Sequence, residues 1–297
     1  MPGSIRRYKL HSEIDENESK VQKSKYGLFA FFFFYFAGIG LLNTFLPIHW
    51  QKSGFTFAQI GAFNTSSAIA GGIALLPVSA LSDRKRHRHL FVIVGAITSA
   101  ICAILLKFVH YFQGIVVIQA FSGVAMSVGM SLAGAMCADA FQSRNAGKGF
   151  GSARAGGTFG YLLVMGLLLF VSLSVRNWLS FNLSSLCFLF AAASIALAPR
   201  PKNLAISPHA DFRGLVGVLH NSSSIAFILC YFLMQMSFSG QMSYLALHMN
   251  NLKPAPEKGF IPLAFLVSSL VELPFMALSG KFIDRMGAMI PLKIACI

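Results

Sequence analysis

Three charged residues that could bind a ligand or transfer a proton lie within or beside long apolar segments. Asp139 closes one such segment, Arg154 lies fifteen residues later near the start of the next, and Glu272 lies inside another. A charged side chain left without a partner in the hydrocarbon of a membrane is strongly unfavourable. We therefore expect each of the three to contact a partner or a polar cavity.

Asp139 and Arg154 support two interpretations. In the first, they lie on neighbouring helices and face one cavity. In the second, they form a charge pair at the cytoplasmic ends of their helices, where they cap the helices and fix their orientation. The sequence leaves both interpretations open.

Glu272 is flanked by apolar residues and Pro274. A carboxyl group in apolar surroundings favours its neutral form and can exchange a proton when its surroundings change polarity. Proton coupling requires this property. The alternative is a carboxyl group paired with a polar neighbour for structure alone.

Two similar loops also carry paired charges, Asp83-Arg84 and Asp284-Arg285, and their aspartates are 201 residues apart. A period of that length, built of apolar segments, predicts a six-helix unit used twice. Acid–base pairs at helix ends can stabilise one closed state, which favours a conformational latch formed by these four residues. The basic run that follows Asp83 also fits a simple topology signal.

The elements that position these residues are predicted to be membrane-spanning helices. Of the 297 residues, 55% are hydrophobic and only 11% charged, too few charges for the surface of a soluble domain. Runs of about 20 apolar residues without strict alternation predict helices and exclude a barrel. We expect eight spans and the start of a ninth near Ile290: Tyr26–Ile48, Phe57–Leu81, Leu90–Phe108, Phe112–Cys137, Ala155–Leu173, Trp178–Ala198, Ser224–Leu247 and Phe260–Ser279.

The net charge of +14 follows the predicted topology. With the N-terminus in the cytoplasm, 19 of the 24 Lys and Arg residues fall on the cytoplasmic side. This is the distribution that the positive-inside rule predicts. The charge therefore indicates orientation in a plasma (inner) membrane and does not indicate nucleic-acid binding.

The spans divide the chain into four parts. Residues 1–25 are expected to be a mobile cytoplasmic tail, 26–198 an N-terminal six-helix repeat, 199–223 a cytoplasmic linker rich in proline and basic residues, and 224–297 a partial second repeat.

Other residue types add less. Gly156 and Gly160 have the GxxxG spacing that lets helix backbones approach closely in lipid. The five cysteines lie in or at the edges of apolar spans, which favours small buried residues over disulfides or metal ligands. The sequence contains no metal-ligand cluster, phosphate-binding loop or nucleophile triad. It predicts neither an enzyme nor a cofactor.

Several segments resemble the lactose-permease-like sugar–proton symporters of the major facilitator superfamily. Residues 27–36, followed by 45–48, are similar to the first helix of that group. Residues 138–141, 150–154 and 157–161 are similar to its fourth-to-fifth helix region. The resemblance covers nearly the whole chain and implies an all-α bundle of twelve helices, of which this sequence supplies eight and the start of a ninth.

The two loops match that superfamily unequally. The loop around Asp284 is similar to its Gly-x-x-x-Asp-Arg-x-Gly loop. The loop around Asp83 departs from it, because Ser79 and Arg86 replace the glycines. This loop is specific to the superfamily but does not indicate the substrate.

The resemblance also implies roles for individual residues. Asp139 and Arg154 would bind solute hydroxyl groups, and Tyr161 would stack on the ring of a sugar. This sequence has the shorter aspartate and a tyrosine where tryptophan is usual. These departures leave the binding of a polar solute expected but not that of the same sugar. Related symporters carry a glutamate in the eighth helix, although the register of Glu272 differs by about one helical turn.

We therefore expect a secondary transporter that moves a small polar solute, most plausibly a sugar or oligosaccharide, with a proton by alternating access. The expected partners are the solute, H⁺ and the lipid bilayer, without nucleic acid or metal. Nucleosides and aromatic acids are alternative substrates. A truncated, non-transporting membrane protein is an alternative of a different class, as is, more weakly, a membrane-embedded enzyme. If the sequence ends naturally at Ile297, we expect a partner chain to complete the bundle.

Overall fold

The computed structural model describes residues 2–85, 87–140, 146–170, 177–198, 220–252 and 260–286. Every regular element in these ranges is an α-helix. The helices are α1 (Pro2–Lys52), α2 (Phe57–Lys85), α3 (Arg88–Phe108), α4 (Phe112–Ala140), α5 (Ala146–Phe170), α6 (Asn177–Leu197), α8 (Ser222–Asn250) and α9 (Phe260–Met286).

Six of these helices, α1 to α6, are long and apolar enough to cross a membrane. They match the first six predicted spans. In α8 and α9, the parts whose side chains the structure describes contain the apolar stretches Ser222–Ser237 and Phe260–Pro274. Eight complete spans therefore remain a prediction. The expected ninth segment near Ile290 and most of the expected linker lie outside the described residues.

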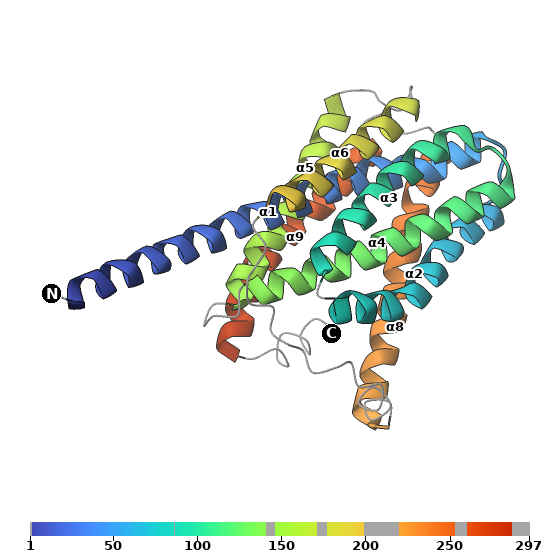
Figure 1. The fold of residues 1–297 in the computed structure, drawn as a ribbon. Helices are drawn as coiled ribbons and strands as arrows, with labels where there is room; N and C mark the ends of the chain where they lie inside the picture. The colour runs from blue at the N-terminus through green and yellow to red at the C-terminus, as the bar shows by residue number, and fades with distance from the viewer. Residues whose placement is uncertain are drawn as a thin grey trace.

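The first helix differs from the expectation of a mobile tail before residue 26. Its backbone is helical from Pro2, and the apolar span begins at Ser24. The N-terminal part projects from the bundle (Figure 1). Residues 4–26 contain neither glycine nor proline, so nothing interrupts the helix that the span nucleates.

The bundle is built around α1, which packs on α5 and α6, while α2 packs on α4 and α3 packs on α4 and α6 (Figure 1). The buried face of α1 carries large side chains, including Leu28, Phe31, Phe32 and Tyr35, each at most 1% exposed. The α9 helix joins this group mainly through α5, and α8 joins it through α1. The first helix is therefore the element against which residues of α5 are positioned.

Glycines bring α5 close to α1, as the GxxxG spacing predicts. A Cβ atom on Gly156 would lie 2.5 Å from the backbone oxygen of Phe29, and one on Gly160 would collide with the backbone of Phe33. Only glycine permits this approach, in which helix backbones gain van der Waals contacts. The close packing holds the start of α5 firmly against the aromatic stretch of α1.

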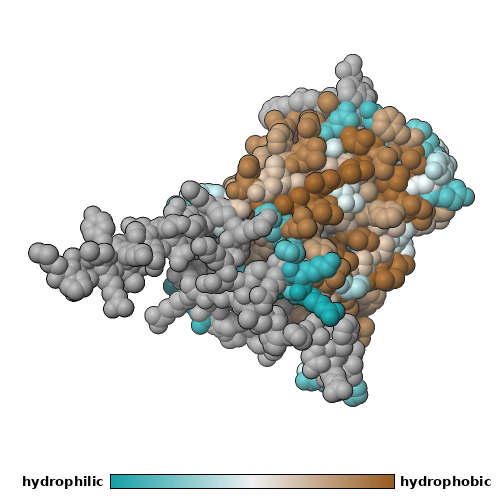
Figure 2. Space-filling view, viewed as in Figure 1, coloured by the Kyte–Doolittle hydropathy of each residue, from teal (hydrophilic) through white to brown (hydrophobic). Residues whose placement is uncertain are grey.

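On the face that Figure 2 shows, the surface of the described helices is predominantly hydrophobic. One face of α3 is exposed at helical spacing, through Leu90, Val94, Ile97, Ile101, Leu105 and Phe108. An apolar face of this length is expected where a helix contacts lipid.

The α8 helix contacts the bundle unevenly along its length. At the end of the bundle where α1 finishes, here called the Lys52 end, Ala246 and Leu247 are buried and Gln51 Nε2 donates a hydrogen bond to Asn251 Oδ1 at 3.3 Å. Toward its start, α8 extends away from the bundle (Figure 1), and its apolar side chains from Ile225 to Met236 are exposed.

Candidate functional site

Arg154 occupies an aromatic setting between α5 and α1. Its guanidinium carbon lies 3.9 Å from the centroid of the Phe36 ring and 5.9 Å from that of Phe32. The atom Nη1 is buried and has no hydrogen-bond partner. Stacking on an aromatic face compensates a guanidinium group in part, but a buried N–H without an acceptor remains unfavourable.

Gly157 provides the space for this arrangement. A Cβ atom at this position would lie 2.7 Å from Nη1 of Arg154 and 2.7 Å from Cδ2 of Phe36. Any larger residue would have to displace the guanidinium group, the Phe36 ring or both. The conformation of Arg154 therefore depends on a glycine one turn along its own helix.

Tyr161 lies on the same side of α5, two turns after Arg154. Its hydroxyl group forms a hydrogen bond with the side chain of Thr44 on α1. Its ring packs on α1 at Gly40, where a Cβ atom would lie 3.0 Å from Cδ2 of the ring. The hydrogen bond and the packing hold the tyrosine against α1.

Glu272 approaches this region from α9. Its carboxylate lies close enough to Arg154 and Tyr161 to interact electrostatically with both. The sequence interpretation placed Glu272 in apolar surroundings, but the residue is exposed in the structure. The reason is that α9 packs on the described helices mainly through α5, so its other faces remain open.

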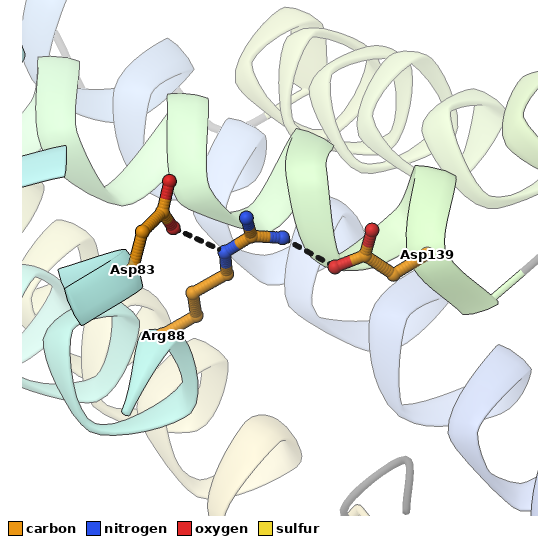
Figure 3. A network of polar contacts seen from close by, with 3 residues as sticks. All are labelled: Asp83, Arg88 and Asp139. Atoms are coloured by element: carbon orange, nitrogen blue, oxygen red, sulfur yellow. Dashed lines mark hydrogen bonds and ion pairs between the residues drawn. The ribbon is translucent and has the colours of Figure 1, made fainter. Parts of the chain in front are cut away.

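A second polar cluster lies at the opposite end of the bundle from Lys52, where α2 finishes and α3 begins. Figure 3 shows Arg88 between two carboxylates. Its Nε atom donates to Asp83 Oδ1 at 2.6 Å, and Nη1 donates to Asp139 Oδ2. The side chains of Arg88 and Asp139 are largely buried, with 15% and 17% of their surface exposed. The cluster ties together the ends of α2, α3 and α4.

A family comparison identifies the larger group. The model of the Major Facilitator Superfamily matches residues 28–297. The chain belongs to this superfamily. With several long apolar helices, it is therefore a multi-pass membrane protein.

Two kinds of relatives accompany this match. An uncharacterized MFS-type transporter of Methanocaldococcus jannaschii is 24% identical over 142 residues, which span 48% of this chain and 36% of the relative. The aligned part is thus little more than a third of the relative's length.

Among solved structures, a mutant of the nucleoside transporter NupG superposes with a TM-score of 0.71 at 16% identity, over 89% of this chain and 69% of NupG. The human organic anion transporter MFSD10 (TETRAN) superposes with a TM-score of 0.57 at 15% identity, over 90% and 73% of the two chains. At these identities the likeness shows the superfamily fold and does not show a substrate.

Within this superfamily fold, the predicted site residues fall into two groups. Arg154, Tyr161 and Glu272 lie together, whereas Asp139 pairs with Arg88. The expected contact between Asp139 and Arg154 is not among the ion pairs that the described residues form. Asp139 lies near the end of α4, as in the interpretation of a charge pair at helix ends. Its partner there is Arg88 and not Arg154.

The predicted latch residues are also only partly paired. Asp83 binds Arg88, while its neighbour Arg84 is exposed. On α9, Arg285 is exposed at the last turn, and the side chain of Asp284 lies outside the described residues. Whether the four residues act as a latch therefore stays a prediction.

Sequence analysis missed four residues that shape these clusters: Arg88, Phe36, Thr44 and Gly157. Arg88 belongs to a basic run in which no pattern distinguishes one cation from its neighbours. Phe36 ends an uninterrupted aromatic run, so periodicity does not indicate which ring faces α5. The spacing of Arg154 and Gly157, three residues apart on one helix, was a usable signal for neighbouring positions.

Proposed function

We propose that this protein is a secondary active transporter that moves a small polar solute together with a proton. The observation that carries the proposal is the buried Nη1 atom of Arg154, which lacks an acceptor and lies near Glu272, with Tyr161 two turns further along the same helix. A solute that accepts a hydrogen bond from Arg154 would satisfy this donor. Tyr161 would contact the body of the solute.

Glu272 supplies the proton-coupling group in this proposal: its side chain is exposed in this state, and closure of the two repeats would bring it into less polar surroundings. Its carboxylate interacts with Arg154 across the contact between α5 and α9, so its protonation changes the charge that a solute meets. The two residues belong to different predicted repeats. A solute bound between them would favour closure of the repeats around it, as alternating access requires.

The shape of the described helices supports this motion. The contact of Gln51 with Asn251 joins α1 to α8 at the Lys52 end, and the start of α8 stands apart from the bundle at the other end. We infer that the structure represents a state closed at the Lys52 end and open at the Asp83 end. With the N-terminus in the cytoplasm, as the distribution of Lys and Arg predicts, the Asp83 end would face the cytoplasm of a plasma-membrane protein.

The solute class follows less directly. The sugar class implied by the resemblance depended on Asp139 and Arg154 acting together, and Asp139 is bound by Arg88 instead. A small polar solute held by Arg154, Tyr161 and Glu272 is the function that the geometry supports best. The cluster of Asp83, Arg88 and Asp139 would hold the helix ends and, with Arg84, Asp284 and Arg285, form the proposed latch.

Uptake by vesicles that contain the protein tests the proposal. We expect uptake of labelled lactose, uridine or benzoate to require an inward proton gradient, and to be lost in Arg154→Gln and in Glu272→Ala. A matched control is Lys107→Gln, which removes another cation near an aromatic ring, that of Phe108. Uptake that Arg154→Gln leaves unchanged contradicts the site. Absence of uptake for all three compounds favours the non-transporting alternative.

A further inference from the structure

We propose that the solute carries a carboxylate, which binds Arg154, and that a proton held by Glu272 crosses the membrane with it. This inference rests on the proposed function and names the substrate class of the same site. It follows from the hydrogen-bonding state of Arg154, the planar shape of its guanidinium group and the nearby carboxylate of Glu272.

The hydrogen-bonding state of Arg154 favours an anion over a neutral ligand. Nη1 is buried without an acceptor, and the aromatic rings of Phe36 and Phe32 flank the cation. A sugar hydroxyl would satisfy the N–H group but would not supply a hydrogen-bonded counter-ion, and Arg154 forms no ion pair among the described residues. A carboxylate does both, and its charge-assisted hydrogen bonds are roughly twice as strong as neutral ones.

The planar shape of the guanidinium group favours a planar anion. Its Cζ atom lies over the Phe36 ring, 3.9 Å from the ring centroid. The N–H bonds of a guanidinium group lie in its own plane, so it donates to a ligand at its edge. Two coplanar N–H donors match the two oxygens of a carboxylate.

Glu272 explains how a proton would accompany the anion. When it is ionised, its carboxylate competes with a ligand carboxylate for Arg154. When Glu272 takes up a proton, it becomes neutral and no longer competes. The ligand anion then binds the positively charged Arg154. Release of the proton on the other side restores the competing carboxylate and favours release of the anion. One anion and one proton therefore cross together without net charge.

Few other groups influence this exchange in the described part of the chain. On α5, Arg154 and Tyr161 interact electrostatically with Glu272. The α8 helix, which also contacts α9, carries no Asp, Glu, Lys or Arg. Its titratable residues are Cys230, Tyr231, Tyr244 and His248, and the last of these lies in its final turn.

Binding to the detergent-solubilised protein tests the inference with two matched pairs of compounds, benzoate with benzamide and gluconate with glucose. Within each pair the carboxylate is replaced by a neutral group on a similar body. Calorimetric titrations at acidic and alkaline pH would compare wild type with Arg154→Gln, Arg154→Lys and Glu272→Gln. Circular dichroism and size-exclusion chromatography would show that each variant is folded.

We expect wild type to bind the carboxylate of at least one pair about tenfold or more tightly than its neutral partner, and only at acidic pH. Arg154→Gln removes that preference. Arg154→Lys keeps a reduced preference, because it retains the charge but not the planar donors. Glu272→Gln, which resembles the protonated residue, binds the carboxylate equally at both pH values.

The outcomes that overturn the inference differ from those that overturn the proposed function. If glucose or benzamide binds as tightly as the acids, and Arg154→Gln loses this binding, the solute site at Arg154 stands. The inference that the solute must carry a carboxylate is then refuted. Binding of an acid that Arg154→Gln does not weaken refutes the inference too. If no compound binds and the vesicles take up no solute, both proposals fail.

Discussion

Arg88 and Arg154 are the same residue in two opposite situations. Arg88 lies between two carboxylates, one from α2 and one from α4, which act as counter-ions for its charge (Figure 3). Arg154 has an aromatic ring over one face, a buried N–H without an acceptor, and a carboxylate nearby on α9. A satisfied cation holds helices together, whereas an unsatisfied one remains available to a ligand. The comparison predicts opposite consequences when each arginine is removed.

Replacing Arg154 by Gln has the largest expected effect on transport. Uptake should fall about a hundredfold or more, because the interaction lost is a buried charge-assisted hydrogen bond to the solute. The temperature of unfolding should stay the same or rise, since the variant removes a buried donor that lacks an acceptor. Uptake and thermal unfolding, measured on the same preparation, check both halves. A marked loss of stability without loss of uptake would show that Arg154 stabilises the fold and does not bind the solute.

Replacing Arg88 by Gln should have the opposite balance of effects. Asp83 and Asp139 would lose their shared counter-ion, and the free energy of unfolding should fall by about 1–3 kcal/mol. The lower part of this range is favoured because 38% of the Asp83 side chain is exposed. Arg84→Gln is the matched control, since this neighbouring cation is exposed and its removal should change stability by less than about 0.5 kcal/mol. If Arg88→Gln lowers the free energy of unfolding no more than Arg84→Gln does, the ion pairs of Arg88 do not stabilise the fold.

The sequence was sufficient for the fold because the elements of a membrane protein are specified by long one-dimensional patterns. Apolar length and the Lys and Arg distribution located α1 to α6 without any knowledge of contacts. The GxxxG spacing also identified the close approach of α5 to α1. The sequence did not indicate that α1 starts at Pro2, before its apolar span, because a polar segment can continue a helix even where it cannot enter a membrane.

The site was only half predictable, because pairing depends on three-dimensional proximity. Arg154 and Tyr161 lie seven residues apart on one helix, so their common face follows from the helical period. The partner of Asp139 does not. Arg88 is 51 residues away in the sequence and was masked by adjacent cations, while Arg154 appeared a better partner from its position near the next helix end.

Gly157→Ala should weaken solute binding without removing any charge. The added methyl group would lie 2.7 Å from Nη1 of Arg154 and 2.7 Å from Cδ2 of Phe36, so the guanidinium group, the Phe36 ring or both must shift. We expect affinity to fall about tenfold, which corresponds to roughly 1.4 kcal/mol, while proton coupling persists. Gly72→Ala is the control, because a Cβ atom there meets nothing within 4 Å. Unchanged affinity in Gly157→Ala would mean that the stacked position of Arg154 is not the one that binds solute.

The smallest expected effect concerns the contact between Gln51 and Asn251. It is a single exposed hydrogen bond at 3.3 Å, so its loss in Gln51→Ala should cost only about 0.5 kcal/mol. If that bond holds the Lys52 end closed, the population open at that end should rise about twofold. Spin labels at Lys52→Cys and Leu252→Cys, in a chain whose native cysteines are replaced by serine, would measure this population. An unchanged distance distribution would assign closure to apolar contacts around Ala246 and Leu247, which are fully buried there, and would leave the exposed bond without a role in the motion.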